Sequence, residues 1–148
     1  MIYVDADACP VKDEIYRVAR RHGVKVVIAA NNPMFVPTDD LFELVVKTGF
    51  GVVDDWIAEA CTAGDVVITG DIPLAARALL KGARVLDHRG RAFTENDIHD
   101  LMATRDLMTA LRAAGEPTRG PAPFSAKDRS SFLSKLDDTL HAVKRLGK

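Results

Sequence analysis

Residues 1–30 have the sequence MIYVDADACPVKDEIYRVARRHGVKVVIAA. The apolar run 1–4 ends in an acid, and Pro10 then precedes a helical pattern of apolar residues that Gly23 stops. Residues 24–30 are almost all apolar and rich in β-branched side chains, which is typical of a strand covered on both faces. The segment therefore predicts a strand, a helix and a second strand.

The same alternation continues along the chain. Strands are expected at 42–46, 65–69 and 85–86, with helices beginning at Asp54 and near Pro73 between them. Strands that alternate with helices favour a parallel sheet joined by right-handed crossovers. We therefore predict an α/β fold, a three-layer α/β/α sandwich with a mostly parallel sheet of about five strands and additional C-terminal helices.

The C-terminal third predicts two further helices. Thr94 begins a long one, and Ser125 begins an amphipathic one after a connector at 115–123 that is rich in Gly and Pro. A chain of 148 residues fits one domain, so we predict a single domain at 1–148 with a helical extension from about residue 94. The apolar stripe of the last helix predicts packing on its own domain or on a second copy in a homodimer.

Composition limits the class of protein. The net charge of -1 gives no bulk attraction to a polyanion, so contact with nucleic acid requires a local basic patch. Cys9 and Cys61 match no zinc spacing and no disulfide framework, which indicates reduced thiols. No apolar segment approaches the roughly 20 residues that span a bilayer. We expect a cytoplasmic protein without membrane segments.

Several acids follow strands of the predicted sheet. Asp5 comes directly after the first strand with Asp7 two residues later, and Asp71 follows the fourth strand. Asp54 opens the helix after the third strand beside its apolar face, while Asp55 points away from that face. Because ligands of open α/β sheets bind beyond the carboxyl ends of the strands, we expect these carboxylates to converge on one site.

Clustered carboxylates predict a cation. They repel one another and raise each other's pKa unless a cation lies between them, and oxygen-only ligands favour Mg²⁺ or Mn²⁺. The predicted metal-ligating residues are Asp5, Asp7, Asp54 and Asp71. The alternative is that some of these acids merely occupy helix N-termini, where Asp is common. That alternative does not account for Asp5 and Asp7.

Basic residues near the predicted site could bind phosphate. Lys12 lies one turn beyond the first acids, and His88 and Arg89 follow the last predicted strand. The alternative is ordinary solvated surface charge. No Gly-x-Gly-x-x-Gly motif follows a strand and no Walker motif is present, so a nucleotide cofactor has no support.

Six short motifs lie along the chain: DADACPVK at 5–12, DDWI at 54–57, TGDIPLA at 69–75, GRAFT at 90–94, GP at 120–121 and DR at 128–129. Together they resemble the bacterial YaiI/YqxD family, which in turn is similar to the PIN-like nuclease superfamily. The likeness implies that Asp5, Asp54 and Asp71 are catalytic metal ligands and that Asp7 is an additional acid. A fourth acid often present in PIN domains has no clear counterpart, and its candidate substitutes are Asp39, Asp40 and Glu43.

The resemblance to PIN-like nucleases, together with the clustered acids, implies a metal-dependent nuclease that hydrolyses phosphodiesters, with RNA or structured single strands as the expected substrate and Mg²⁺ or Mn²⁺ as cofactor. An alternative is a phosphatase with an aspartyl nucleophile, because Asp5-Ala-Asp7 also resembles the opening motif of haloacid-dehalogenase-like phosphatases. Asp5 would then be the nucleophile and Asp7 the general acid. A third alternative is a module that binds metal or nucleic acid without catalysis.

Overall fold

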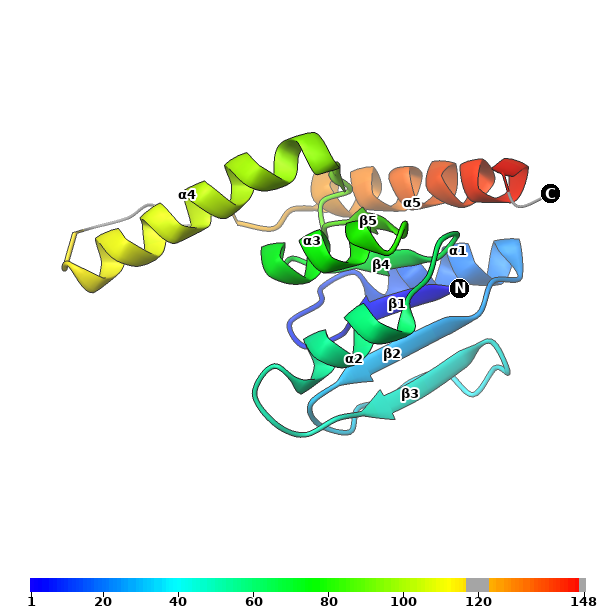
Figure 1. Cartoon of the computed structure of the whole chain (residues 1–148). Coiled ribbons are helices and arrows are strands. Elements are labelled where there is room, and N and C mark those ends of the chain that lie inside the picture. Colours follow the sequence, from blue (N-terminus) through cyan, green and yellow to red (C-terminus); the bar gives the residue numbers. More distant parts are fainter. Residues whose placement is uncertain (117–122, 147–148) are drawn as a thin grey trace.

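The structure is a computed structural model that describes residues 1–116 and 123–146, so most of the predicted connector lies outside the described residues. In chain order the elements are β1 Ile2–Asp5, α1 Lys12–His22, β2 Val26–Ala30, β3 Phe42–Val46, α2 Val52–Ala60, β4 Val66–Ile68, α3 Ile72–Leu80, β5 Arg84–Leu86, β6 Ala92–Phe93, α4 Glu95–Ala113 and α5 Ala126–Leu146 (Figure 1).

The sheet has the order β3-β2-β1-β4-β5-β6, and its first five strands are parallel. The predicted α/β class and the mostly parallel sheet are confirmed. The sheet contains a sixth strand that the sequence did not predict, because β6 pairs antiparallel with β5 after a tight turn. In that turn the Asp87 N–H donates to the carbonyl of Arg91 over 2.9 Å. A strand of two residues is too short to show a period.

Helices cover both faces of the sheet, as the three-layer prediction requires. Ile2 and Val4 of β1 point into one apolar cluster with α1 and α5, whereas Tyr3 between them points into the other, with α2 and α3. This alternation follows from the two-residue period of a strand. Figure 1 shows α5, in orange to red, beside α1 and on the other side of the sheet from α2.

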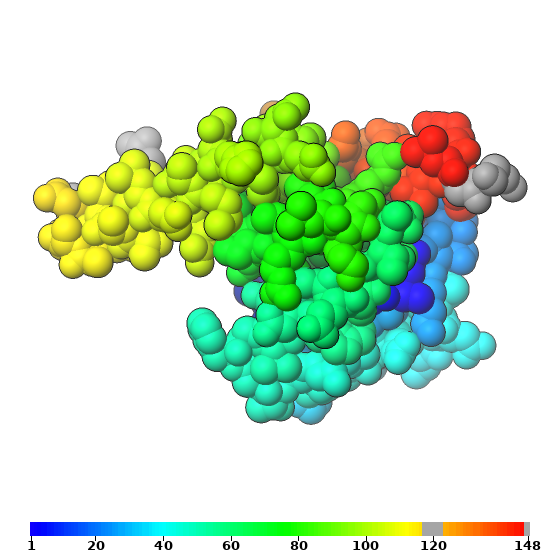
Figure 2. Space-filling model, viewed as in Figure 1, coloured from blue at the N-terminus to red at the C-terminus, as the bar shows by residue number. Residues whose placement is uncertain are grey.

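The two C-terminal helices begin where the sequence predicts. The Thr94 hydroxyl accepts a hydrogen bond from the Asp97 N–H at the start of α4, and the Ser125 hydroxyl accepts one from the Asp128 N–H at the start of α5. Helix α5 buries Phe132 against its own domain, so the homodimer stays a prediction. Helix α4 has no buried residue and protrudes from the body (Figure 2).

One predicted helix start was wrong. Helix α2 begins at Val52, two residues before Asp54, because Gly51 takes the N-cap position with φ 73°. That left-handed backbone favours glycine over an acidic capping residue. Among the described residues, no helix is long and apolar enough to cross a membrane.

Candidate functional site

The four predicted acids line one hollow at the carboxyl edge of the sheet. Strand β1 lies between β2 and β4, so the winding direction of the chain reverses there. A cavity of about 290 Å³ opens at this point. Its lining residues are Asp5, Asp7, Asn31, Phe50, Gly51, Val53, Asp54 and Asp71. We call the four carboxylates, Asp5, Asp7, Asp54 and Asp71, the acid cleft.

Thr69 connects two of these acids. Its hydroxyl donates to Oδ2 of Asp5 over 2.8 Å and accepts from the N–H of Asp71 over 3.0 Å. The Thr69 side chain is fully buried, and these two bonds satisfy its hydroxyl. Because the single hydroxyl proton goes to Asp5, Thr69 fixes the carboxylate at the end of β1 and the backbone that enters α3.

Asp71 also caps α3. Its Oδ1 accepts a hydrogen bond from the N–H of Leu74 over 2.8 Å, and Asp71 is the N-cap residue of that helix. The cap sets the orientation of the carboxylate at the mouth of the cleft. The expectation that an acid at a helix N-terminus acts as a cap is therefore confirmed for Asp71, and its position in the cleft is confirmed as well.

Asp7 is held over the end of β2. The backbone N–H of Asn31 donates to its Oδ2 over 3.0 Å. Ala8, the next residue along the chain, has φ 60°, a left-handed conformation that costs a non-glycine residue about 1–2 kcal/mol. Strained backbone of this kind concentrates at functional sites. The turn after β1 therefore keeps Asp7 in the cleft at a conformational cost.

The two acids of α2 point in different directions, as the helical wheel predicts. Asp54 lines the cleft, whereas Asp55 is exposed and pairs with Arg77 over 2.6 Å. Burial, followed by the charges of Asp71 and Asp5, raises the pKa of Asp54 to about 6.

Burial and neighbouring negative charges also raise the pKa of Asp5. Burial raises the pKa of Asp5, the Thr69 hydrogen bond opposes that rise, and the charges of Asp71 and Asp7 add to it. Burial is the largest cause of both rises, and the charge of Arg77 opposes the rise at Asp54 without cancelling it, so the protein's own cations compensate this negative charge only in part. A divalent cation in the cleft would supply the missing charge.

The spacing of the acids suits a hydrated ion. Among the described residues, the only group of three His, Cys, Asp or Glu ligand atoms within 4.8 Å of one another is His22, Asp137 and His141, far from this cleft. Within the part of the chain that the structure describes, no three carboxylates of the acid cleft meet that criterion. Mg²⁺ keeps several waters and commonly binds through one or two carboxylates, so wider spacing fits it.

A second hollow of about 610 Å³ adjoins the cleft and shares Phe50, Gly51, Asp54 and Asp71 with it. Its lining also includes Asp55, Arg77 and Arg105. Arg77 pairs with Asp55 over 2.6 Å, and Arg105 pairs with Asp106 over 3.6 Å. The Phe50 side chain is fully exposed between Gly49 at φ 124° and Gly51 at φ 73°, conformations that glycine adopts readily. The rim therefore presents an aromatic ring and two guanidinium groups beside the carboxylates.

Comparison with known proteins identifies the family. The family model described as "Uncharacterized BCR, YaiI/YqxD family" matches residues 3–142. This chain belongs to the YaiI/YqxD family. The UPF0178 protein of Azorhizobium caulinodans is 54% identical over 147 residues, covering 99% of this chain and 92% of that protein. The UPF0178 protein bll3966 of Bradyrhizobium diazoefficiens is 55% identical over 145 residues, covering 97% and 87%. No solved structure matches the chain.

In this YaiI/YqxD family protein, the basic residues predicted to bind phosphate lie outside the cleft lining. Lys12 donates from Nζ to the carbonyl of Cys9 over 3.1 Å. Arg89 pairs with Asp128 over 2.8 Å, which connects the turn before β6 to the first turn of α5. The substrate-binding roles of Lys12, His88 and Arg89 stay predictions.

His88 lies closer to the acids than the other two. A Cβ added to Gly70 would stand 3.7 Å from Cε1 of His88, so the imidazole packs beside the residue that precedes Asp71. Nε2 of His88 is buried and has no hydrogen-bond partner among the described residues. Burial lowers the pKa of His88, the charge of Asp87 opposes that fall, and the charge of Lys12 adds to it. A neutral imidazole therefore lies next to the cleft.

The candidate substitutes for a fourth PIN acid lie at the opposite edge of the sheet. Asp39 and Asp40 precede β3 and Glu43 is its second residue, so all three belong to the amino edge. Asp39 pairs with Arg20 and Glu43 with Lys25. In the cleft of this family member the fourth carboxylate is Asp7.

Sequence reasoning missed three residues of the site. Thr69 lies two residues before Asp71, and that spacing was the available signal for its contact with the acids. Asn31 follows β2 and so lies at the same edge as the acids. Phe50 between two glycines indicates an exposed turn, but its place beside the cleft depends on how α2 packs.

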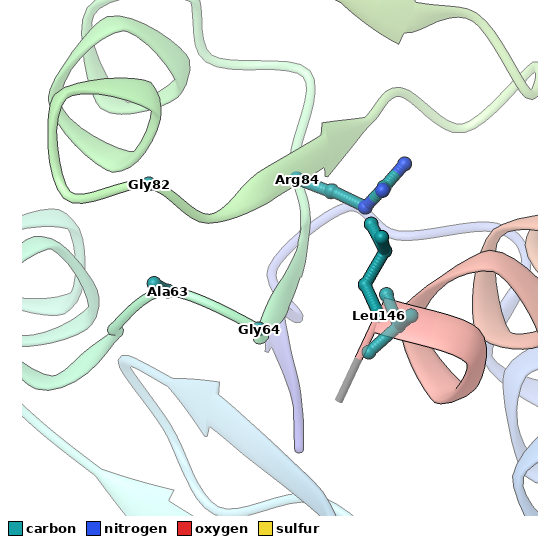
Figure 3. Close-up of a pocket in the computed structure, with 6 residues that line it drawn as sticks. Ala63, Gly64, Gly82, Arg84 and Leu146 are labelled. Carbon is teal, nitrogen blue, oxygen red and sulfur yellow. The ribbon is translucent and has the colours of Figure 1, made fainter. Parts of the chain in front are cut away.

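The amino edge carries another hollow, of about 350 Å³ (Figure 3). Its lining residues are Ala63, Gly64, Gly82, Arg84, Val143 and Leu146. Within the described residues, Arg84 is its one charged group, and a single guanidinium offers neither a nucleophile nor a base. The acid cleft is therefore the better candidate for chemistry.

Proposed function

We propose that this YaiI/YqxD family protein is a metal-dependent nuclease that hydrolyses phosphodiesters in single-stranded nucleic acid, RNA above all. The observation that carries the proposal is the convergence of four carboxylates at the switch point of the sheet, two of them with raised pKa values. The sequence likeness to PIN-like nucleases supports the same reaction.

The oxygen-only donor set fits a hard cation, Mg²⁺ or Mn²⁺. Asp5, Asp54 and Asp71 would hold it, with Asp7 as an additional acid. When bound, such an ion polarises the phosphoryl group and lowers the pKa of a water nucleophile. Thr69 keeps Asp5 in place for this role through its 2.8 Å hydrogen bond. Asp54 must lose its proton to bind, so protons and the cation compete for it.

The rim fits a single strand better than a duplex. The exposed Phe50 ring can stack on an unpaired base, and stacking of this kind tolerates any sequence. Arg77 and Arg105 line the adjoining hollow and can contact backbone phosphates. These local contacts replace the bulk positive charge that the chain lacks.

Cleavage of labelled single-stranded RNA and DNA tests the proposal. The wild-type chain should cleave at least one of them with Mg²⁺ or Mn²⁺ and lose activity with a chelator. Asp71→Asn should lose cleavage, because it removes a ligand charge while Asn keeps the helix cap. Asp39→Asn, whose carboxylate pairs with Arg20 at the opposite edge of the sheet, is the matched control and should retain activity. Equal cleavage by wild type and Asp71→Asn, or none by wild type, would contradict the proposal.

A phosphatase is the second candidate, because Asp5 and Asp7 line the same cleft two residues apart. An aspartyl nucleophile passes through a phospho-enzyme, whereas an activated water does not. Small phosphomonoesters are therefore the discriminating substrates. Fast turnover of them, with phosphate trapped on Asp5, would favour the phosphatase over the nuclease.

A further inference from the structure

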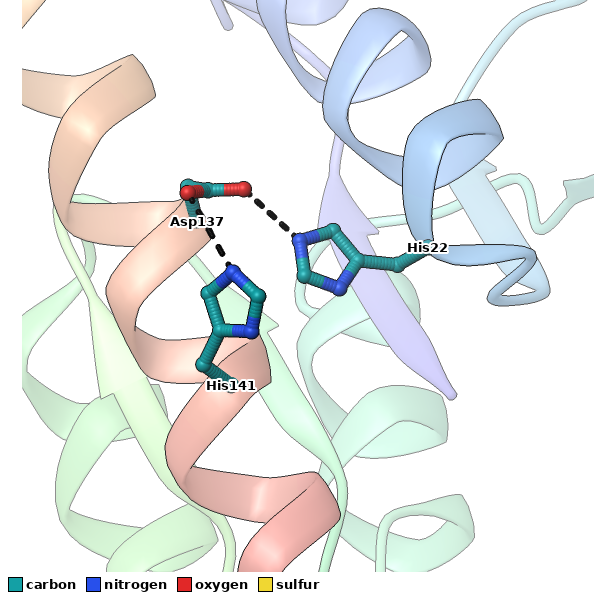
Figure 4. Close-up of side chains that lie close together, drawn as sticks. All are labelled: His22, Asp137 and His141. Carbon is teal, nitrogen blue, oxygen red and sulfur yellow. Dashed lines mark hydrogen bonds and ion pairs between the residues drawn. The ribbon is translucent and has the colours of Figure 1, made fainter.

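A second group of metal-ligating side chains lies at the opposite edge of the sheet from the acid cleft. His22 is the last residue of α1, and Asp137 and His141 lie on α5 (Figure 4). Nε2 of His22 is 2.7 Å from Oδ1 of Asp137, and Nε2 of His141 is 3.6 Å from Oδ2. Both imidazoles thus point toward one carboxylate. We call these three residues the histidine cluster.

Apolar packing positions the cluster. Asp137 and His141 are four residues apart on α5, so they share a helix face. Leu136 and Leu140, the residues immediately before them, are buried between α5 and the sheet. The His22 side chain is only 3% exposed, and Gly23 ends α1 directly after it. The core therefore fixes where the three side chains meet.

We propose that the histidine cluster is a binding site for a divalent transition-metal ion of the Zn²⁺ class, which would join α1 to α5. Two imidazole nitrogens and one carboxylate oxygen favour Zn²⁺, Co²⁺, Ni²⁺ or Cu²⁺ over Mg²⁺ and Ca²⁺. The ligand atoms already lie within 4.8 Å of one another. Zinc–nitrogen bonds of about 2.0–2.1 Å require a closer approach. His141, which is 56% exposed, has the freedom to supply it.

The carboxylate of the cluster is in the state that a metal ion needs, whereas Nε2 of His22 donates its N–H to that carboxylate, so a metal ion must displace this proton. The His22 hydrogen bond, with the charges of His141 and Arg21, holds the pKa of Asp137 below its usual range, so its carboxylate is ionised. The exposed side of His141 leaves room for a water or another ligand in the fourth position, as in open zinc sites.

Arg21 is a cation that would compete with the metal ion for Asp137. Nη1 of Arg21 lies 3.3 Å from Oδ1 of Asp137, and its side chain is half exposed. A metal ion and this guanidinium carry the same sign and compete for one carboxylate. Lys144 is the other nearby cation, and it donates to the carbonyl of His22 over 3.2 Å. Removal of Arg21 should therefore strengthen metal binding, although it removes an ion pair.

Calorimetric titration of Zn²⁺ into the full, tag-free chain tests the site, with excess Mg²⁺ present to occupy the acid cleft. We expect one Zn²⁺ per chain and a higher melting temperature. His22→Gln and His141→Gln should each lower the affinity by more than about tenfold, since even second-shell losses reach that size. Arg21→Gln should raise it. His99→Gln, which alters an exposed histidine of α4, is the matched control and should change nothing.

Spectroscopy identifies the ligands directly. Cu²⁺ in place of Zn²⁺ should give EPR splitting from two imidazole nitrogens in the wild type and from one in His141→Gln. Because His141 is exposed, its variant should fold even if His22→Gln does not. Absence of saturable Zn²⁺ binding, or the same affinity in His141→Gln, would overturn the proposal. Melting temperatures that Zn²⁺ leaves unchanged would also overturn it and leave a hydrogen-bonded contact. These Zn²⁺ binding and melting measurements do not depend on whether the acid cleft has nuclease activity.

Discussion

The acid cleft and the histidine cluster both gather ligand atoms, but by different means. The cleft collects residues that follow strands or begin helices at the carboxyl edge of the sheet, and all of its charged ligands are oxygens. The histidine cluster forms where α1 meets α5 at the amino edge, and two of its three ligands are nitrogens. One region would suit a hydrated hard cation and the other a directly coordinated softer one.

The two regions also differ in how their charge is balanced. Burial and mutual repulsion raise the pKa values of Asp5 and Asp54, so the cleft is short of positive charge. Hydrogen bonding from His22 lowers the pKa of Asp137, so the histidine cluster is balanced without an ion. Ionised acids in the cleft therefore oppose folding until a cation binds, whereas the histidine cluster already connects two helices.

The largest expected effect is loss of one property while the other is kept, which would show that the acid cleft and the histidine cluster act independently. An Asp5→Asn and Asp71→Asn double variant should reduce Mg²⁺-dependent RNA cleavage by at least about 100-fold, because it removes two ligand charges. Its Zn²⁺ affinity should match that of the wild type. The reciprocal His141→Gln variant, at an exposed position, should lose most of its Zn²⁺ affinity and keep cleavage. Cleavage rates and Zn²⁺ titrations on both variants check the comparison, and loss of both properties in either would show that the regions are coupled.

Next in size is the effect of Phe50. Replacing it with alanine should weaken binding of a short single-stranded RNA by about 1–3 kcal/mol, the usual contribution of one stacked base. Fluorescence anisotropy in the Asp71→Asn background measures binding without cleavage. Phe35→Ala is the control, because Phe35 is also exposed but does not line the cleft. Equal losses in the two variants would argue against a stacking role at the rim.

A smaller effect concerns the stability of the cleft itself. The pKa of Asp54 is about 6 in the folded chain, above its ordinary value of 3.8. The folded chain thus binds this proton more tightly than the unfolded chain, and ionisation between about pH 4 and pH 6 lowers the free energy of unfolding. The Asp54→Asn side chain does not ionise, so the variant avoids this fall in the free energy of unfolding. Solvent screening of this partly exposed group limits its gain to about 1 kcal/mol at pH 7.

Urea unfolding with a chelator present measures this gain. The variant should exceed the wild type at pH 7 and approach it near pH 4. Added Mg²⁺ should stabilise the wild type and leave Asp54→Asn less affected. A wild type that is the more stable protein at pH 7 without metal would contradict the charge imbalance in the cleft.

The smallest effect is that of Asp55. Asp55→Asn breaks an exposed ion pair with Arg77 and should cost a few tenths of a kcal/mol. Mn²⁺ affinity, measured by calorimetry, should stay within about twofold of the wild type, because loss of an exposed ion pair changes free energies by only a few tenths of a kcal/mol. If Asp55→Asn loses the ion and Asp54→Asn keeps it, Asp55 and not Asp54 is the ligand from α2.

The difference between the regions explains what the sequence could predict. The strand–helix–strand pattern of residues 1–30 predicted parallel strands, and the carboxyl ends of parallel strands share an edge by rule. Asp5, Asp7, Asp54 and Asp71 could therefore be brought together from their positions alone. The pairing of His22 with Asp137 spans 115 positions and depends on the register of two packed helices. The four-residue spacing of Asp137 and His141 was the only visible signal.

Local conformation explains the other differences. Strand β6 has two residues and pairs with β5 because Asp87 accepts bonds from the N–H groups of Arg89 and Arg91 in the turn. Helix α2 starts early because Gly51 adopts a positive φ, which composition alone does not reveal. Both features come from backbone geometry rather than from apolar periodicity, the signal on which the sequence predictions relied.

Asp71 both caps α3 and lines the acid cleft, so a hydrogen bond at the start of α3 should respond to a cation in the cleft. Its Oδ1 accepts the N–H of Leu74, so any cation that withdraws electron density from this carboxylate weakens that hydrogen bond. In an NMR spectrum of the ¹⁵N-labelled protein, the Leu74 amide peak should move upfield as Mg²⁺ is added, and its hydrogen exchange should quicken. One amide on a buried leucine, already in place at the start of α3, would thus report occupancy of the cleft without any attached label.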